Sequence, residues 1–146
     1  MIYILFILSF LFMEFVAWSN HKYVMHGFLW SLHKDHHIGT NASKPGFQKN
    51  DLFFLMYATP AIILIISGLS ISNPNLIATG AGITLYGFTY FTIHDVIIHQ
   101  RIPILTNPSS WYLKAIIKAH AAHHKPATPK DFKNYGLLIF PGRFFN

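Results

Sequence analysis

The chain has 146 residues, of which 52% are hydrophobic and 11% charged, and this apolar share is typical of a membrane protein rather than a soluble domain. It contains no cysteine, which excludes a disulfide framework, an iron–sulfur cluster and any thiolate metal site built from this chain alone. The net charge of +6 is then a signal of membrane topology before it is a signal of nucleic-acid binding.

Three apolar stretches predict transmembrane helices within a single domain, residues 1–146. The first, about residues 1–18, carries one charge, Glu14, and lacks the basic start and small-residue cleavage site of a secretory signal. The second and third, about residues 52–72 and 76–98, are each close to the roughly 20 residues that span the hydrocarbon core. We therefore predict an all-α integral membrane helical bundle with three to four transmembrane helices. Small residues that would let the third helix pack closely on a neighbour are Ala78, Gly80, Gly82 and Gly87.

The basic residues indicate how these helices are oriented. If three helices cross, residues 19–51 and everything after about residue 99 lie on one side of the membrane. All eleven Lys and Arg, Lys130 among them, then fall on that side, which the positive-inside rule makes cytoplasmic. The ten histidines lie on the same side or just inside it. We expect a histidine-rich metal site on the cytoplasmic face.

The histidines form four spaced groups, and a five-spaced pair followed by an HxxHH triplet occurs twice. On a regular helix the triplet projects three imidazoles from one face, because its first histidine lies within about 60° of the second and about 40° of the third. The members of a five-spaced pair lie about 140° apart on such a helix. They must flank a metal pair, serve different metals or lie on a locally distorted turn. The groups are His21 and His26; His33, His36 and His37; His94 and His99; and His120, His123 and His124.

A further helix is predicted over about residues 109–124, along the membrane surface. Ser109 or Ser110 can cap it, and Pro126 stops it. Its histidines share a face with apolar residues, which we expect to point toward the bundle, while its lysines point to water. The basic face can bind anionic lipid or an acidic electron donor. It consists of Lys114, Lys118 and Lys125.

The residue types restrict the metal centre. The familiar di-iron carboxylate bundle needs several glutamates, and this chain has one, Glu14. Imidazole suits iron, copper, zinc and nickel, and ten histidines exceed what one ion can hold. Two six-coordinate ions have about twelve positions, which leaves a few for water or a bridge. The sequence favours a two-metal redox centre, although a zinc- or nickel-binding tract is an alternative.

The four histidine groups resemble the histidine boxes of one enzyme family. HKYVMHG, HKDHH, HDVIIHQR followed by Pro103, and the ending AHAAHH are similar to the boxes of bacterial β-carotene hydroxylases, within the fatty acid hydroxylase and sterol desaturase superfamily. The resemblance covers roughly residues 10–145. It implies a non-haem di-iron monooxygenase in the bacterial cytoplasmic membrane that uses O2 and reduced ferredoxin. The implied reaction hydroxylates C3 of β-ionone rings, from β-carotene to β-cryptoxanthin and zeaxanthin.

The resemblance also implies that all ten histidines surround the two irons, with one or two of them orienting other ligands instead of binding iron. Three carboxylates are candidates to accept an imidazole N–H and fix its tautomer: Asp35, Asp95 and Glu14. Seven side chains are near enough to line the approach of a carotenoid, although lipid contact or core packing is the alternative for each. They are Trp18, Tyr23, Met25, Phe28, Trp30, Tyr90 and Phe91.

Two other functions remain open. A superfamily member acting on fatty acyl chains or sterols would need a cap to hold a carrier head group, and this short chain shows none. A non-enzymatic metal-binding or transport protein would place polar ligands near the bilayer middle, where residues 52–72 and 76–93 hold no histidine or carboxylate. We expect lipid, a carotenoid and a ferredoxin-type donor as partners, and no nucleic acid.

Overall fold

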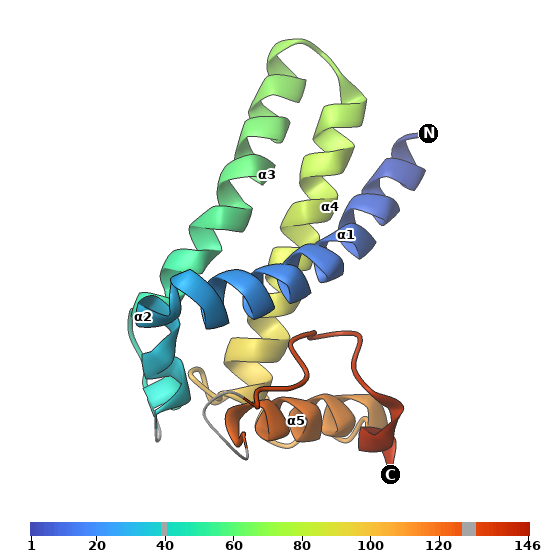
Figure 1. The fold of residues 1–146 in the computed structure, drawn as a ribbon. Coiled ribbons are helices and arrows are strands. Elements are labelled where there is room, and N and C mark those ends of the chain that lie inside the picture. The colour runs from blue at the N-terminus through green and yellow to red at the C-terminus, as the bar shows by residue number, and fades with distance from the viewer. Residues whose placement is uncertain (39–40, 127–130) are drawn as a thin grey trace.

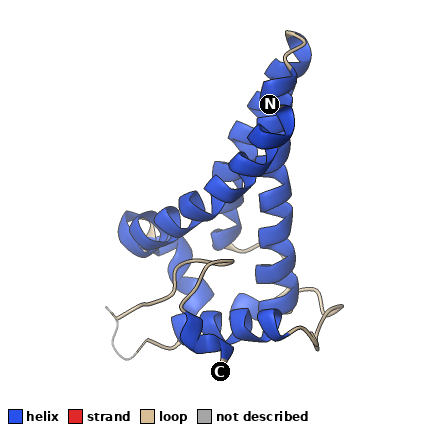
Figure 2. Cartoon of the chain, turned by 90° about the vertical axis from the view of Figure 1, so that its right-hand side faces the viewer, coloured by secondary structure: helices blue, strands red, loops and turns tan. Residues whose placement is uncertain are grey.

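All regular elements in the described part of the chain are helices (Figures 1 and 2). The computed structural model describes residues 1–38, 41–126 and 131–146, so that Lys130, counted above for topology, lies outside the described residues. Three helices are long and apolar enough to cross a membrane. The predicted all-α membrane bundle is therefore confirmed, with three spans in the described residues. They are Ile2–Phe28, Lys49–Ser70 and Pro74–Ile98.

The first span consists of α1 (Ile2–Ser19) and a π-helical segment, Asn20–Phe28, that continues α1 and is kinked at Gly27, where the backbone is not helical (φ −104°, ψ −123°). Much of α1 is exposed in the isolated chain; Leu11 and Phe12 expose 58% and 61% of their surface. Apolar side chains on the outside of a spanning helix contact lipid, where exposure costs nothing. A short helix, α2 (Trp30–His33), and a 3-10 turn, Lys34–His37, follow the span.

The second and third spans form a helical hairpin. α3 (Leu52–Ser70) begins after the short 3-10 helix Lys49–Asp51 and runs through Pro60. The Asn73 side chain accepts hydrogen bonds from the backbone N–H groups of Asn75 and Leu76 and so caps α4 (Pro74–Tyr90). A second π-helical segment, Phe91–Ile98, extends α4 to the end predicted from the sequence.

Glycines on α4 let it pack against both other spans. A Cβ on Gly80 would lie 2.9 Å from the Ala61 carbonyl oxygen of α3, and one on Gly82 would lie 2.4 Å from the Phe6 carbonyl oxygen of α1. The close packing expected of these two residues is confirmed, and Ala78 is buried as well. Gly87 has open space around it, so its expected role in packing was wrong.

The helix α5 (Trp111–His124) lies across one end of the bundle, roughly perpendicular to the spans (Figure 1). It begins at Trp111 rather than at residue 109, and its N-cap Ser110 forms no side-chain capping bond. The tail then rises along the bundle toward α1 and returns to a terminal 3-10 helix, Gly142–Phe145 (Figure 1). The ends of α1, α2, α4 and α5 thus meet at one end of the molecule.

Candidate metal centre

The ten histidines gather where these helix ends meet, in two adjoining groups. In each group, one ring nitrogen of every member lies within 4.8 Å of those of all the others. His94 belongs to neither set, but its ring lies 4.6 Å from that of His99 and 4.9 Å from that of His120. The first group is His21, His26, His33, His37 and His123, and the second group is His36, His99, His120 and His124.

The pair His21 and His26 lies in the first π-helical segment, and the pair His94 and His99 lies at the end of the second, with His99 as its C-cap. The His99 N–H donates to the His94 carbonyl oxygen at 3.0 Å, a hydrogen bond that spans five residues. In such a turn residue i+5 lies nearly in line with residue i, which is the position of residue i+4 in an α-helix. Ring centroids are accordingly 4.6 Å apart for His94 and His99, and 5.0 Å apart for His21 and His26. Of the three interpretations of this spacing, the locally distorted turn is confirmed.

Each HxxHH triplet contributes to both groups, which spacing alone did not predict. His36 lies in the second group although its neighbour His37 lies in the first. His123 of α5 joins the first group in the same way. The groups touch where the rings of His37 and His124 stack with centroids 4.3 Å apart. Each half of the sequence repeat therefore contributes histidines to both groups.

Hydrogen bonds on the outer ring nitrogens determine the tautomers in the first group. The Nδ1 of His21 lies 2.9 Å from the Tyr135 carbonyl oxygen, and the Nδ1 of His123 lies 2.7 Å from the Lys133 carbonyl oxygen. A carbonyl oxygen can only accept, so each Nδ1 carries the proton. The Nδ1 of His33 donates in the same way to Asn50 Oδ1 at 2.6 Å. A neutral imidazole has one N–H, so all three rings have a bare Nε2.

Two of these bare nitrogens, on His21 and His33, face each other, and the ring of His37 adjoins them. The Nε2 of His21 lies 3.2 Å from the Nε2 of His33, and the Nε2 of His33 lies 3.0 Å from that of His37. Two facing lone pairs repel unless a cation lies near both. Four buried nitrogens also have no hydrogen-bond partner within the described residues, at a cost of about 1–3 kcal/mol each. They are His36 Nδ1 and Nε2, His37 Nδ1 and His124 Nε2. This donor set fits transition-metal ions that accept imidazole nitrogen.

Burial keeps these imidazoles neutral. Desolvation, the largest cause, lowers the pKa of His33 to about 3, that of His123 to about 4 and that of His124 to about 3. The pKa values of His36 and His120 are also lowered well below 6.5 by burial and then by neighbouring histidines. A histidine must be neutral to bind a metal. The site is thus prepared for metal binding at neutral pH.

An ionic network supports His94 from outside the two groups. Asp95 Oδ2 lies 3.3 Å from His94 Nδ1, and Asp95 Oδ1 accepts from Arg101 Nη1 at 2.5 Å. Arg101 also donates to both oxygens of Asp51, at 2.7 and 2.8 Å, and to the Gly46 carbonyl oxygen at 2.6 Å. We did not single out Arg101 from the sequence, although it ends the box HDVIIHQR.

Comparison with known proteins agrees with this geometry. The family model described as "Fatty acid hydroxylase" matches residues 6–146. The chain belongs to the fatty acid hydroxylase family. It is 39% identical over 129 residues to "Beta-carotene hydroxylase" of Pantoea ananas, covering 88% of this chain and 71% of that protein. For "Beta-carotene hydroxylase" of Pseudescherichia vulneris the identity is 41% over 132 residues, covering 90% and 73%.

A plant relative is also similar, but the match covers a smaller share of that protein. "Beta-carotene 3-hydroxylase 2, chloroplastic" of Arabidopsis thaliana is 35% identical over 136 residues, covering 88% of this chain and 42% of that protein. No solved structure matches the chain. The family assignment therefore rests on sequence.

We expected three carboxylates to accept an imidazole N–H, and two of them have other partners. Asp35 Oδ2 lies 3.9 Å from Lys49 Nζ on an exposed surface. Glu14 accepts hydrogen bonds from Tyr86 and from the backbone of the C-terminal tail. It lies seven residues before His21, which is about 10 Å along a helix, too far for the expected contact. Asp95 lies beside His94, where we expected it, and its role stays a prediction.

A cavity of about 440 Å³ opens beside the first histidine group. Tyr23 and Trp30, which we expected near substrate, are in its wall. The other five candidates lie elsewhere: Trp18 packs against Tyr23, Tyr90 packs against His94, Met25 is buried, and Phe28 and Phe91 are exposed. Sequence reasoning missed Phe132 and Tyr135, which come from the tail, far from the other wall residues in sequence. The lining residues are Lys22, Tyr23, His26, Gly27, Trp30, Phe132 and Tyr135.

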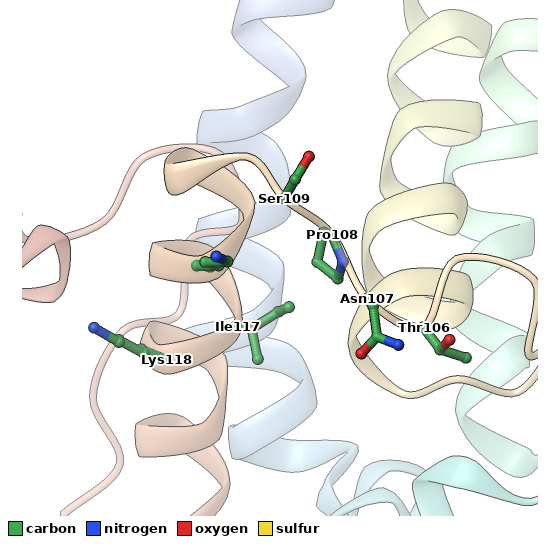
Figure 3. A pocket seen from close by; sticks show the side chains of 7 residues that line it. Thr106, Asn107, Pro108, Ser109, Ile117 and Lys118 are labelled. Atoms are coloured by element: carbon green, nitrogen blue, oxygen red, sulfur yellow. The ribbon is translucent and has the colours of Figure 1, made fainter.

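Figure 3 shows another cavity, of about 540 Å³, between α5 and the loop before it. Its wall contains no histidine. The lining side chains are a mixture of polar and apolar groups with two lysines, and none of them suits a redox metal, so this cavity lacks the chemistry of an oxidation site. They are Thr106, Asn107, Pro108, Ser109, Lys114, Ile117 and Lys118.

Proposed function

We propose that this chain is a β-carotene 3-hydroxylase formed by a single domain, residues 1–146. It would act as a non-haem di-iron monooxygenase that hydroxylates C3 of β-ionone rings, converting β-carotene to β-cryptoxanthin and then to zeaxanthin. The observation that carries the proposal is the pair of adjoining groups built of imidazole alone. The printed names of the relatives support the choice of substrate.

The two histidine groups would each hold one iron ion. His21, His26, His33, His37 and His123 are the proposed ligands of one, and His36, His99, His120 and His124 those of the other. We propose His94 as a further ligand on the second side, because its ring adjoins those of His99 and His120. The iron pair, when bound, supplies the redox chemistry by which O2 can oxidise an unactivated C–H bond.

The wall of the 440 Å³ cavity would position the substrate ring. The Phe132 ring lies 4.2 Å from the His26 ring, and the Trp30 ring lies 5.1 Å from it. Flat aromatic walls bind an apolar ring and keep water away from the reacting carbon. Tyr23 and Lys22, whose Nζ lies 5.0 Å from the Tyr23 ring centroid, form the outer edge. A carotenoid in the bilayer would then present one ring end to the first group.

Orientation and electron supply complete the proposal. The chain is an integral membrane protein, and we place the histidine groups at the cytoplasmic face of a bacterial inner membrane, because the basic residues lie at the same end. Lys114 and Lys118 are exposed on α5, and Lys125 is exposed at its C-cap. Their charge primarily sets topology and also attracts an acidic ferredoxin-type donor. Reduced ferredoxin would supply the two electrons that a monooxygenase needs.

Expression in cells that accumulate β-carotene tests this function. We expect the wild-type chain to convert β-carotene to zeaxanthin, measured by pigment chromatography, and the His36→Ala variant to leave β-carotene unchanged. The matched control is Lys34→Ala, an exposed residue of the same turn, which should behave as wild type. Persistence of β-carotene with the wild-type chain, or equal conversion by His36→Ala, would show the proposal to be wrong. Iron near zero in protein purified anaerobically under reducing conditions would refute the di-iron centre.

A further inference from the structure

The C-terminal tail covers the first histidine group and contacts it through both backbone and side chains. We call residues 131–139 the strap; in Figure 1 it rises from the end of α5 toward α1. Its Tyr135 and Lys133 carbonyl oxygens accept from the Nδ1 atoms of His21 and His123. The position of the strap therefore decides which nitrogen of two histidines carries the proton.

One carboxylate inside the first membrane span holds the strap. Glu14 Oε1 accepts from the backbone N–H groups of Leu137, Leu138 and Ile139, at 2.9, 2.9 and 3.0 Å. Its other oxygen, Oε2, accepts from the Tyr86 hydroxyl of α4 at 2.6 Å. Only 6% of Glu14 is exposed. A carboxyl group in a membrane helix is costly, and four donors on its two oxygens are the compensation that such burial requires.

The strap is shaped to reach this carboxylate. A Cβ on Gly136 would lie 2.3 Å from the Ile139 carbonyl oxygen and 3.1 Å from Glu14 Oε1, so a side chain at this position would open the turn that presents the three N–H groups. The Tyr112 hydroxyl of α5 donates to the Leu138 carbonyl oxygen and holds the strap from the other side. The turn is therefore fixed between α1 and α5.

We propose that Glu14 is a positioning residue of the metal centre. It anchors the strap, and the strap carbonyl oxygens keep the Nδ1 atoms of His21 and His123 protonated, so that both Nε2 atoms face the interior of the first group. This inference rests on the proposed function only in taking the first group as a metal site. Loss of a hydrogen-bond partner behind a metal ligand typically costs about 10- to 100-fold in metal affinity.

The effect should be confined to one of the two sites. In the described part of the chain, the ring contacts and hydrogen bonds between the strap and the histidines all involve the first group, such as those of Phe132 with His26 and His37. Loosening the strap should therefore weaken metal binding by the first group and leave the second group unchanged. General unfolding would weaken both.

The test titrates the metal-free full-length protein in detergent with Co2+, which serves as a spectroscopic probe for the two sites. Glu14→Ala removes the acceptor, and we expect at least about tenfold weaker binding at one of the two sites. Glu14→Gln keeps one acceptor oxygen and should recover part of the affinity. Gly136→Ala should weaken the same site, whereas Gly142→Ala, in the same tail with open space around it, should match wild type.

Limited digestion gives a second measure. Cleavage by chymotrypsin after Tyr135 should be faster in Glu14→Ala and Gly136→Ala than in wild type. The inference is overturned if Glu14→Ala retains wild-type affinity at both sites, if both sites weaken equally, if Gly142→Ala behaves like Gly136→Ala, or if the wild type binds only one Co2+ ion. The proposed function fails separately: two bound ions in the wild type, with unchanged β-carotene in cells, would refute the hydroxylase and leave the anchor supported by the variants.

Discussion

At the level of single residues, the chemistry of the candidate centre depends on protons. His21, His33 and His123 each donate from Nδ1 to an oxygen outside the group, so Nε2 is free to bind a metal. The oxygens come from two backbone carbonyls and from Asn50. Burial adds a second constraint, because a protonated imidazole loses its hydration when the chain folds. Both constraints favour neutral histidines that are ready to act as ligands.

The lowered pKa values predict acid-sensitive stability of the metal-free protein. The pKa of His33 falls from 6.5 to about 3 and that of His123 to about 4 on folding. Between these values and 6.5 the unfolded chain binds more protons than the folded chain, so the free energy of unfolding decreases as the pH falls. We expect the thermal midpoint in detergent to be constant above about pH 7 and to drop steadily below it. A midpoint that stays level from pH 7 to pH 5 would contradict this prediction.

At the level of elements, two π-helical segments and one glycine-rich helix arrange the site. The π-helical turns bring residues five apart onto one side, so a spacing that scatters side chains on a regular helix here collects them. The glycines of α4 bring its backbone against α1 and α3. α4 leads into the segment that carries His94, and α1 leads into the segment that carries His21. Close packing of α1 against α4 therefore places the two histidine pairs at the same end of the bundle.

Substitution of Gly82 tests this packing. A Cβ would lie 2.0 Å from Ser9 Oγ and 2.4 Å from the Phe6 carbonyl oxygen, so the Gly82→Val variant must separate α1 from α4. Overpacking of this kind typically costs about 1–3 kcal/mol, and we expect a lower thermal midpoint in detergent. The matched control is Gly87→Ala on the same helix, with open space around Gly87. Equal midpoints for Gly82→Val and the control would show that the helices are not in close contact here.

At the level of the whole molecule, Arg101 joins segments that are distant in the chain. It binds Asp95 at the end of the third span, Asp51 at the start of α3 and the carbonyl oxygen of Gly46. The side chains of Arg101 and Asp95 are each 13% exposed. These carboxylates raise the pKa of Arg101 above its usual value, and the guanidinium therefore keeps its charge at any physiological pH.

Removal of this guanidinium should be strongly destabilising. Arg101→Ala leaves two mostly buried carboxylates unpaired, and breaking a buried pair typically costs about 3–5 kcal/mol. We expect a large drop in the thermal midpoint and weaker metal binding by the second group, which adjoins His94. Lys49→Ala, which removes the exposed pair with Asp35, is the control and should have little effect. Equal thermal midpoints for Arg101→Ala and Lys49→Ala would contradict the predicted contribution of the ionic network to stability.

The amino-acid sequence by itself determined the three spans, the confinement of the histidines to one end and their division into four groups. These properties depend on local hydrophobicity and spacing, which neighbouring residues decide. Tertiary structure decided which histidine joins which group, because His36 and His123 cross between groups only when the turn Lys34–His37 meets α5. It also gave Glu14 its partners, since the carboxylate is bound by backbone N–H groups more than a hundred residues away. Backbone donors carry no sequence signal, so only the folded chain could reveal them.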